Sequence, residues 1–551
     1  FLLNPVSAPG SAYDGLGGAN SVAASNFGGV ANNKYYAGLY LQDDWKVTRK
    51  LTINLGVRWD MFSLVGEKYG AQANFVPGAN PKFIIPGSRK DKPGLSQTFQ
   101  NLLTKDGIQL VYSDEWGSGL GNSQKANLAP RLGFAYQATS KLVLRGGYGI
   151  YYGSFENRGG YPNLGYNYPF QFDFNFPSPN DWTPVHFGDG ATGTLANGLA
   201  HIPLDPTLVN GAGLNLRGIE FNYKTPYTQG YNITWQYEFL PGNSLDVGYV
   251  GTLGRHIETF TGSNLPRQIL PPGTDPTPYI PWPDFARGQP YGRTSATSNY
   301  HSLQTKYTRR FSKGLDMLLS YTFAKTLTNA GDLLSGGNVG GFRAPDLPNF
   351  GIAYDYGLAS FNVKHALSYA GTYQLPFGKG RSYGNSMKGV SQILLGGWDM
   401  NWILALYSGQ PQSVGCTVAT TSGMGCYALV NGDPYGGSQN INHFYNAAAF
   451  SNPAVATTIG QSDYSPLGGY LTPVSGPSYH KLDFSVFKQI PIKERYRMEF
   501  RAESFNLTNT PNFANPGNTN FQDANNFGRI FSTRNNPNDA RQIQLALKFY
   551  W

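Results

Sequence analysis

Side chains that could carry out catalysis are few and scattered in this chain of 551 residues. Its seven histidines show neither an HExxH pattern nor the spacing of metal ligands. The glycines of GSGLG at 117–121 lack the Gly-Lys-Ser/Thr ending and the following helix of a phosphate-binding loop. Asp43 and Asp44 could bind a cation, but near a predicted turn such carboxylates more often face water or arginine. We therefore expect no enzyme activity and assign no metal or cofactor site.

Aromatic side chains between the predicted strands are the only candidates for a binding site. Tyrosine, tryptophan and phenylalanine in large loops can stack on a sugar, a peptide or a chelate. The same side chains can instead pack against one another within the loops, and both interpretations stay open. The candidates are Trp116, Tyr161, Tyr166, Tyr168, Phe170, Trp182 and Trp282.

The clearest element that could hold such loops is the last stretch of the chain, 539–551. Every second residue in it is apolar, namely Ile543, Leu545, Leu547, Phe549 and Trp551. Successive residues of a strand point to opposite faces, so the stretch predicts a half-apolar strand. Its aromatic end resembles the C-terminal signal read by the outer-membrane barrel assembly machinery, with Phe549 and Trp551 as the signal residues. The edge strand of a soluble sandwich is the alternative.

The same alternation of apolar and polar residues recurs along the chain. A strand of about twelve residues rises about 40 Å and, tilted by about 45°, matches the hydrocarbon core of a membrane. Short turns and long loops also alternate, as in transmembrane barrels. The predicted strands are 34–47, 51–62, 131–138, 141–152, 227–239, 245–249, 299–311, 315–325, 362–375, 397–407, 479–489, 495–506 and 539–551. The predicted long loops are 63–126, 153–226, 255–298, 327–360, 409–477 and 507–538.

These about thirteen strands predict an all-β fold, a transmembrane antiparallel β-barrel with long extracellular loops. Residues 1–33 are expected to form a loop tail before the barrel of residues 34–551. Charged residues recur on the polar faces of the strands, and a row of charges requires water or counter-charges. We expect a lumen to supply both for Arg58, Asp60, Arg495, Arg497, Glu499, Arg501 and Glu503.

Composition limits the other classes of protein. Charged residues make up 14% of the chain, and no apolar run reaches 18 residues, so no transmembrane helix is predicted. The net charge is +9, but no cluster of five to eight basic residues exists, which argues against nucleic-acid binding. Cys416 and Cys426 share one Gly/Thr-rich segment, which predicts a loop disulfide in an oxidising compartment, with two free thiols as the alternative.

Several segments resemble the barrel of TonB-dependent outer-membrane receptors of the Oar-like type, which carry a carboxypeptidase-regulatory-like N-terminal domain. They are YYAGLYLQDDWKVTRKLTINLGVRWD, NYHSLQTKYTRRFSKGLDMLLSYTFAKTL, YQLPFGKGRS with GGWDMNWILALYSGQP, and YHKLDFSVFKQIPIKERYRMEFRAESFNLTNTPNF. The resemblance implies a bacterial outer-membrane location, contact with outer-membrane lipid, and an unknown extracellular substrate. It also implies coupling to the TonB energy complex through an N-terminal part, a plug domain, and a barrel of about twenty-two strands.

Three functions are compatible with the sequence. The first is the barrel of an energised transporter, the second an adhesion or scaffold barrel that acts through its loops, and the third a soluble β-rich enzyme or lectin. An odd number of strands would leave the strand at 34–47 with an unpaired edge. We therefore expect this chain to be the C-terminal part of a longer receptor, with a signal peptide, a plug and about nine strands upstream.

Overall fold

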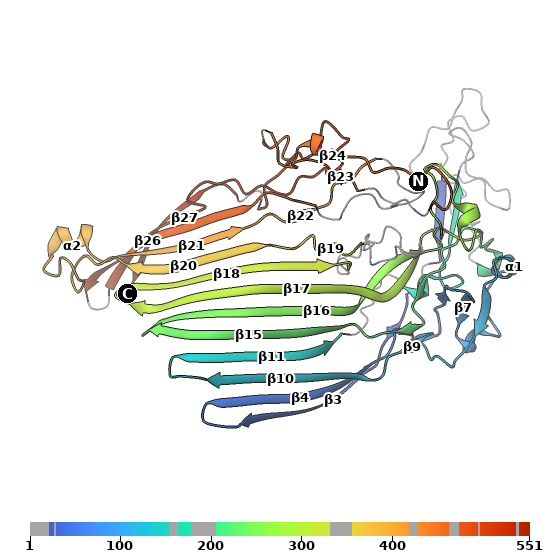
Figure 1. Cartoon of the computed structure of the whole chain (residues 1–551), viewed down its shortest axis with the longest axis horizontal. Helices are drawn as coiled ribbons and strands as arrows, with labels where there is room; N and C mark the ends of the chain where they lie inside the picture. The colour runs from blue at the N-terminus through green and yellow to red at the C-terminus, as the bar shows by residue number, and fades with distance from the viewer. Residues whose placement is uncertain are drawn as a thin grey trace.

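The computed structural model describes ten parts of the chain, residues 21–26, 29–153, 163–177, 205–330, 355–417, 427–437, 439–461, 473–493, 496–535 and 539–551. One large antiparallel sheet forms its body, and loops gather at one end of the strands (Figure 1). Among the helices in these parts, none is long and apolar enough to cross a membrane.

Within the described residues the sheet contains fifteen strands, of which thirteen follow one another along its main path. Each of these pairs antiparallel with the next spanning strand along the chain, as the predicted succession of hairpins requires. They are β3 (Tyr36–Lys46), β4 (Leu51–Phe62), β10 (Asn127–Gln137), β11 (Leu142–Tyr152), β15 (Tyr227–Leu240), β16 (Asn243–Ser263), β17 (Gln289–Ser312), β18 (Leu315–Thr328), β20 (His365–Gln374), β21 (Trp398–Tyr407), β26 (Tyr479–Lys493), β27 (Tyr496–Phe505) and β28 (Gln542–Tyr550). Two short strands, β13 (Gly218–Ile219) and β19 (Gly357–Leu358), pair with β17 and β18.

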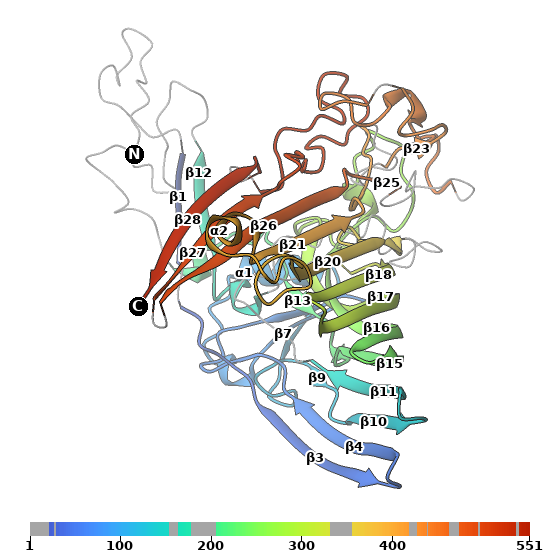
Figure 2. The same ribbon diagram turned by 90° about the vertical axis from the view of Figure 1, so that its left-hand side faces the viewer.

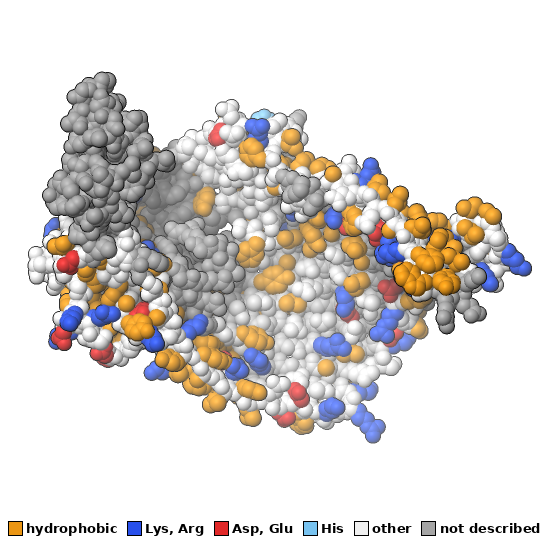
Figure 3. All heavy atoms as spheres, turned by 180° about the vertical axis from the view of Figure 1, so that it is seen from behind, with side chains coloured by type: hydrophobic (Ala, Val, Ile, Leu, Met, Phe, Trp, Pro, Cys, Tyr) orange, Lys and Arg blue, Asp and Glu red, His pale blue; other side chains and the backbone are white. Residues whose placement is uncertain are grey.

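The sheet is strongly curved, so that it has a convex and a concave face (Figure 2). Large apolar side chains recur at alternate positions along the strands and are exposed, as on β28, where Ile543, Leu545 and Leu547 are 66–68% exposed. The concave face, seen in Figure 3, is hollowed and mostly polar, with scattered Lys, Arg, Asp and Glu side chains. The period of two in the sequence therefore sorts apolar and polar side chains onto opposite faces.

The two ends of the sheet differ. Short connections such as 47–50 and 313–314 lie at one end, which we call the short-turn end, together with the C-terminus (Figure 1). The opposite, long-loop end carries the smaller elements of the chain. The exception at the short-turn end is the link between β20 and β21, which contains the helix α2 (Gly389–Leu395).

Two predicted boundaries are wrong. The stretch 255–298 was expected to be a single loop, but β16 continues to Ser263 and β17 already begins at Gln289. These extensions carry Thr, Ser and Gln at many positions and lack a regular alternation of apolar residues, although they still pair with each other. The stretch 63–126 connects two spanning strands, as predicted, and contains a helix and several short strands.

The long-loop end has its own hydrophobic core. Its helix α1 (Gln97–Lys105) begins at Ser96, whose Oγ accepts a hydrogen bond from the backbone N–H of Phe99 (3.1 Å). Phe99 is fully buried against Phe83 and Tyr168, with ring centroids 5.5 and 4.8 Å away. Each such side chain stabilises the loops by about 1.5–3 kcal/mol through burial. The long loops are therefore folded parts of the molecule.

The remaining short elements lie in the loops. The strands are β1 (Ser21–Ser25), β2 (Asn32–Asn33), β5 (Gly66–Glu67), β6 (Asn74–Val76), β7 (Lys82–Ile85), β8 (Gln109–Tyr112), β9 (Asn122–Ser123), β12 (Asp173–Pro177), β14 (Asn222–Tyr223), β22 (Pro411–Gln412), β23 (Leu429–Val430), β24 (Phe450–Ser451) and β25 (Val474–Ser475). The 3-10 helices are η1 (Gly87–Arg89), η2 (Leu164–Tyr166), η3 (Pro206–Leu208), η4 (Thr277–Tyr279) and η6 (Ala447–Ala449).

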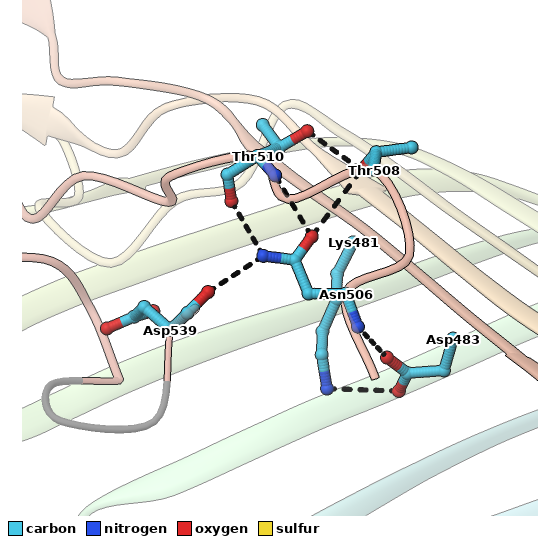
Figure 4. Close-up of polar contacts among 6 residues, drawn as sticks. All are labelled: Lys481, Asp483, Asn506, Thr508, Thr510 and Asp539. Atoms are coloured by element: carbon cyan, nitrogen blue, oxygen red, sulfur yellow. Dashed lines mark hydrogen bonds and ion pairs between the residues drawn. The ribbon is translucent and has the colours of Figure 1, made fainter. Parts of the chain in front are cut away.

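A buried asparagine fixes the connection from β27 to β28 (Figure 4). The Asn506 side chain donates to the carbonyls of Thr510 (2.9 Å) and Asp539 (2.7 Å), and its Oδ1 accepts from the Thr510 N–H (3.1 Å). Its backbone N–H donates to the carboxylate of Asp483, which also pairs with Lys481 at 3.0 Å. The φ of Asn506 is +51°, a left-handed conformation that asparagine tolerates better than most residues.

We predict that Asn506→Ala lowers the free energy of unfolding by about 1–3 kcal/mol, because it removes the hydrogen bonds to the partly buried carbonyls of Thr510 and Asp539. The measurement is the thermal unfolding of the detergent-solubilised protein. Asn509→Ala is the matched control, since Asn509 has the same φ of +51° but is exposed. Equal destabilisation by the two variants would contradict this role of the Asn506 side chain.

A carboxylate at the end of α1 makes the loop core sensitive to pH. Asp106 accepts a hydrogen bond from the backbone N–H of Asp284 (3.2 Å), and Lys105 pairs with the Asp284 carboxylate at 2.8 Å. Partial burial raises the pKa of Asp106 to about 6, and the nearby Asp284 carboxylate adds to the rise. The folded state therefore binds a proton on Asp106 more tightly than the unfolded chain does.

A raised carboxyl pKa gives stability that is complete below about pH 4 and is lost as the pH rises through about 6. We expect hydrogen exchange of the α1 amides to become faster relative to the intrinsic rate across this range, and Asp106→Asn to remove the change. Asp91→Asn, at an exposed carboxylate in the same long loop, is the control. Unchanged pH dependence in Asp106→Asn would show that another group is responsible.

Candidate functional site

The predicted lumen-facing charges neutralise one another in pairs along single strands. On β4, Arg58 pairs with Asp60 at 2.8 Å, and the Tyr36 hydroxyl donates to the same carboxylate (2.8 Å). On β27, Arg501 contacts Glu499 at 2.8 Å and Glu503 at 3.6 Å. Residues two apart on a strand share a face, which is why these partners meet.

The other predicted charges have different surroundings. The Arg497 guanidinium lies 4.5 Å from the ring centroid of Tyr550, and Arg495 lies outside the described residues. Because Asp60 and Glu499 are only 4–5% exposed, their charges depend on the arginines beside them. That this face lines a lumen stays a prediction.

The polar face is also rich in glycine over β4, β10, β11 and β15. Gly133 lies opposite Gly147, and Gly149 lies opposite Gly230 on the next strand. With no side chains at these positions, a hollow of about 400 Å³ remains, which Asn54, Arg131, Tyr151 and Asn232 help to line. The Arg131 guanidinium lies 4.8 Å from the ring centroid of Tyr151, so the hollow combines a cation with an aromatic surface.

A second cavity, of about 300 Å³, lies at the long-loop end between the extended ends of β16 and β17 and the loop that joins them. We call it the Arg–Trp pocket, defined by Glu220, Arg267, Trp282, Tyr291 and Arg293. Each arginine faces an aromatic ring: the Arg267 Cζ is 6.0 Å from the Trp282 ring centroid, and the Arg293 Cζ is 5.4 Å from that of Tyr291. Arginine offers five donors in a planar group that binds carboxylates and phosphates through paired hydrogen bonds.

The wall of the Arg–Trp pocket is held by an asparagine. Asn264 has a φ of +58° and is 2% exposed. Its side chain donates to the carbonyls of Trp282 (2.8 Å), Phe285 (3.2 Å) and Ala286 (3.0 Å), and accepts from the Trp282 N–H (2.9 Å). This single side chain closes the loop on itself and fixes Trp282 in place.

The charges of the Arg–Trp pocket favour an anion. Its carboxylate, Glu220, is already engaged, because its Oε2 accepts from the N–H (3.0 Å) and the hydroxyl (2.6 Å) of Thr294. Two neighbouring polar side chains at the strand ends, Ser263 and Gln289, are buried, and within the described residues the Ser263 hydroxyl and the Gln289 amide group have no hydrogen-bond partner. Buried polar groups of this kind are usually paired, so they can contribute hydrogen bonds to a polar ligand or to water.

The structure separates the predicted loop aromatics into three groups. Tyr168 and Trp282 are only 2–3% exposed and belong to the core of the long-loop end, so they mainly pack within the loops. Of these two, Trp282 also lines the Arg–Trp pocket, where its ring lies beside Arg267. Tyr161 and Trp182 lie outside the described residues. The remaining three are half-buried.

Each half-buried aromatic has a cation near its ring. Lys82 Nζ lies 6.0 Å from the Trp116 ring centroid, and the Arg89 Cζ lies 5.7 Å from that of Phe170. The guanidinium of Arg217 lies 5.5 Å from the ring of Tyr166. Their role in ligand binding stays a prediction, and the structure does not bring them together with Trp282 in one pocket.

The arginines of the Arg–Trp pocket were not among the predicted residues. Arg267 stands in a Pro-rich loop and Arg293 in a stretch that was also expected to be loop, so no period marked either one. Of the predicted disulfide, Cys416 is disulfide-bonded, and Cys426 lies outside the described residues, so the pairing stays a prediction.

Comparison with known proteins finds one matching sequence family and several solved structures of low similarity. Residues 5–544 match the family model described as "Outer membrane beta barrel domain", whereas no curated protein matches the chain. Among solved structures, the outer membrane transporter YddB from Escherichia coli is similar with a TM-score of 0.44 and 12% identity, covering 94% of this chain and 45% of that chain.

Two further structures match at comparable levels. The pyoverdine outer membrane receptor FpvA from Pseudomonas aeruginosa has a TM-score of 0.39 and 9% identity, with 95% of this chain and 42% of that chain covered. The FrpB iron transporter from Neisseria meningitidis has a TM-score of 0.38 and 9% identity, with 94% and 45% covered. The chain thus spans less than half the length of these structures. Because the family model covers almost the whole sequence, the chain belongs to the outer membrane beta-barrel domain family.

Proposed function

We propose that this chain forms the membrane wall and the ligand-binding loops of an outer-membrane receptor of the TonB-dependent class and the Oar-like type, which takes up a substrate from outside the cell. The observation that carries the proposal is the Arg–Trp pocket, which combines two arginines with aromatic rings at the long-loop end. The concave face of the sheet is polar and carries paired charges, which supports a path for a hydrophilic substrate along this face, beyond the pocket.

The pocket narrows the substrate class. Chelates, saccharides and peptides were all compatible with the sequence, and the two guanidinium groups favour acidic members of each class. The buried hydroxyl of Ser263, which lines the pocket, can bind a neutral polar group of the same ligand. A volume of about 300 Å³ holds one small group of such a ligand and not a whole macromolecule.

The partners in this proposal follow from the receptor class. The barrel assembly machinery would insert the protein by recognising the end of the chain at Phe549, near the end of β28, and Trp551, directly after it, both of which are exposed. The TonB energy-coupling complex would act through a plug domain of the receptor. Adhesion through the folded loops is the competing function.

We predict that Arg267→Gln and Arg293→Gln each weaken binding of an acidic ligand about ten- to a hundredfold, because a hydrogen bond to a charged group contributes about 1.5–3 kcal/mol. The measurement is calorimetric titration of the purified protein with a ferric chelate that carries carboxylates, an acidic oligosaccharide and an acidic peptide. Arg529→Gln is the matched control, since Arg529 also lies over an aromatic ring, at 5.3 Å from Phe531, but outside the pocket.

Loss of affinity in the control equal to that in the pocket variants would contradict the assignment of the site. Binding of whole cells or matrix proteins, with no titration by any of the three ligands, would favour adhesion over transport.

A further inference from the structure

The helix α2 is not part of the sheet and lies in a long link at the short-turn end. It lies in the link from Pro376 to Gly397 and projects beyond the ends of the strands (Figures 1 and 2). Neither the proposed ligand site nor the proposed transport path uses it. Its attachment and its surface point to a function of its own.

A buried lysine attaches α2 to the sheet. Lys488 of β26 is 4% exposed and lies opposite Trp398 on one side and Phe500 on the other, within the row that carries apolar side chains outward. Its ammonium group donates to the carbonyl of Gln392 (3.2 Å) and to that of Gly396. The last carbonyls of a helix lack partners within the helix and carry a partial negative charge, so a cation is stabilised there.

Trp398 completes this attachment. Its indole N–H donates to the carbonyl of Leu394 (2.8 Å), and its ring centroid lies 5.2 Å from the Lys488 ammonium. A charge among outward apolar side chains is costly unless it is paired and shielded. The helix therefore serves as the shield of Lys488, and the lysine fixes the position of the helix on the outer side of the sheet.

The apolar side chains of α2 are exposed. Val390, Ile393, Leu394 and Leu395 are 51–70% exposed, although each could have been polar on a helix that faces water. Exposed apolar patches of this kind mark surfaces of contact. The space-filling view shows hydrophobic side chains gathered at this end of the molecule, with Lys and Arg side chains at their border (Figure 3).

Two features identify what covers this surface. The patch continues the outward apolar face of β21 and β26, which faces lipid in an outer membrane β-barrel protein. Exposed lysines, Lys379 and Lys388, flank it within the same link. Apolar residues beside lysines are typical of helices that lie in a membrane interface, with their cations at the lipid phosphates.

We propose that α2 is an interfacial membrane anchor, which lies in the phospholipid leaflet at the short-turn end of the barrel. Its apolar side chains enter the boundary between headgroups and acyl chains, while Lys379 and Lys388 contact the phosphates of anionic phospholipids. In this arrangement α2 and the lipid together shield Lys488. This inference depends on the outer-membrane location and not on the identity of the transported substrate.

The test places a fluorophore on α2 in the complete protein, reconstituted in vesicles of phosphatidylethanolamine and phosphatidylglycerol. The structure contains no free cysteine among its described residues, so a label on Ile393→Cys reports on α2. We expect lipids that carry a nitroxide near the headgroup to quench the label at position 393. We expect iodide in the buffer to quench this label at least about threefold less than it quenches a label at the control position. Thr98→Cys on α1 is the matched control, because it is an exposed helical position at the long-loop end.

The charge arm of the test uses Lys379→Glu together with Lys388→Glu in the labelled protein. We expect this variant to lose about half or more of the lipid-dependent quenching in vesicles that contain phosphatidylglycerol, while the Thr98 label does not change. Iodide quenching of the Ile393 label equal to that of the Thr98 label, with no effect of the nitroxide lipid, would overturn the proposal. That result would mean that α2 faces water and not lipid.

Discussion

Backbone hydrogen bonding in the absence of water is the constraint on which this structure depends. In a hydrocarbon core every N–H and C=O group must find a partner within the protein, and an antiparallel sheet provides one for each strand that has a neighbour on both sides. The ladders from β3 to β28 do so strand by strand along the main path. Once the backbone is fixed in this way, side chains must alternate between two environments, and the apolar face and the paired charges follow.

Charges are placed where this arrangement can neutralise them. Arg58 with Asp60, and Arg501 with Glu499, neutralise each other on the polar face, where two-residue spacing brings partners together. Lys488 is the exception on the outward face, and its partners are helix carbonyls and an indole ring. At the long-loop end, where strands rise out of the apolar belt, arginines lie over aromatic rings and polar groups are buried. The same sheet thus carries an apolar face, a polar concave face opposite it and, at its long-loop end, a candidate ligand site.

The sequence predicted the sheet well because a period of two is visible wherever one face is apolar, as in Leu51–Phe62 and Gln542–Tyr550. It failed where that period stops. The extension of β17 from Gln289 to Ser298 has few apolar residues and no regular alternation, and α2 is only seven residues long, so neither shows a periodic pattern. The Arg–Trp pocket is formed by residues of β16, β17 and the loop between them, together with Glu220 and residues that follow β6, and their proximity depends on tertiary folding. Aromatic composition marked Trp282, but not that its ring would be mostly buried.

The most direct test of the account is site-directed spin labelling along β15, a strand in the middle of the sheet. Single labels at 233–237 would be exposed in turn to oxygen, which partitions into lipid, and to a water-soluble nickel chelate. The account predicts that labels at Ile233, Trp235 and Tyr237 collide mainly with oxygen and that labels at Thr234 and Gln236 collide mainly with the nickel chelate. Accessibility without this alternation, or with the two faces reversed, would contradict the assignment of the apolar face to the membrane.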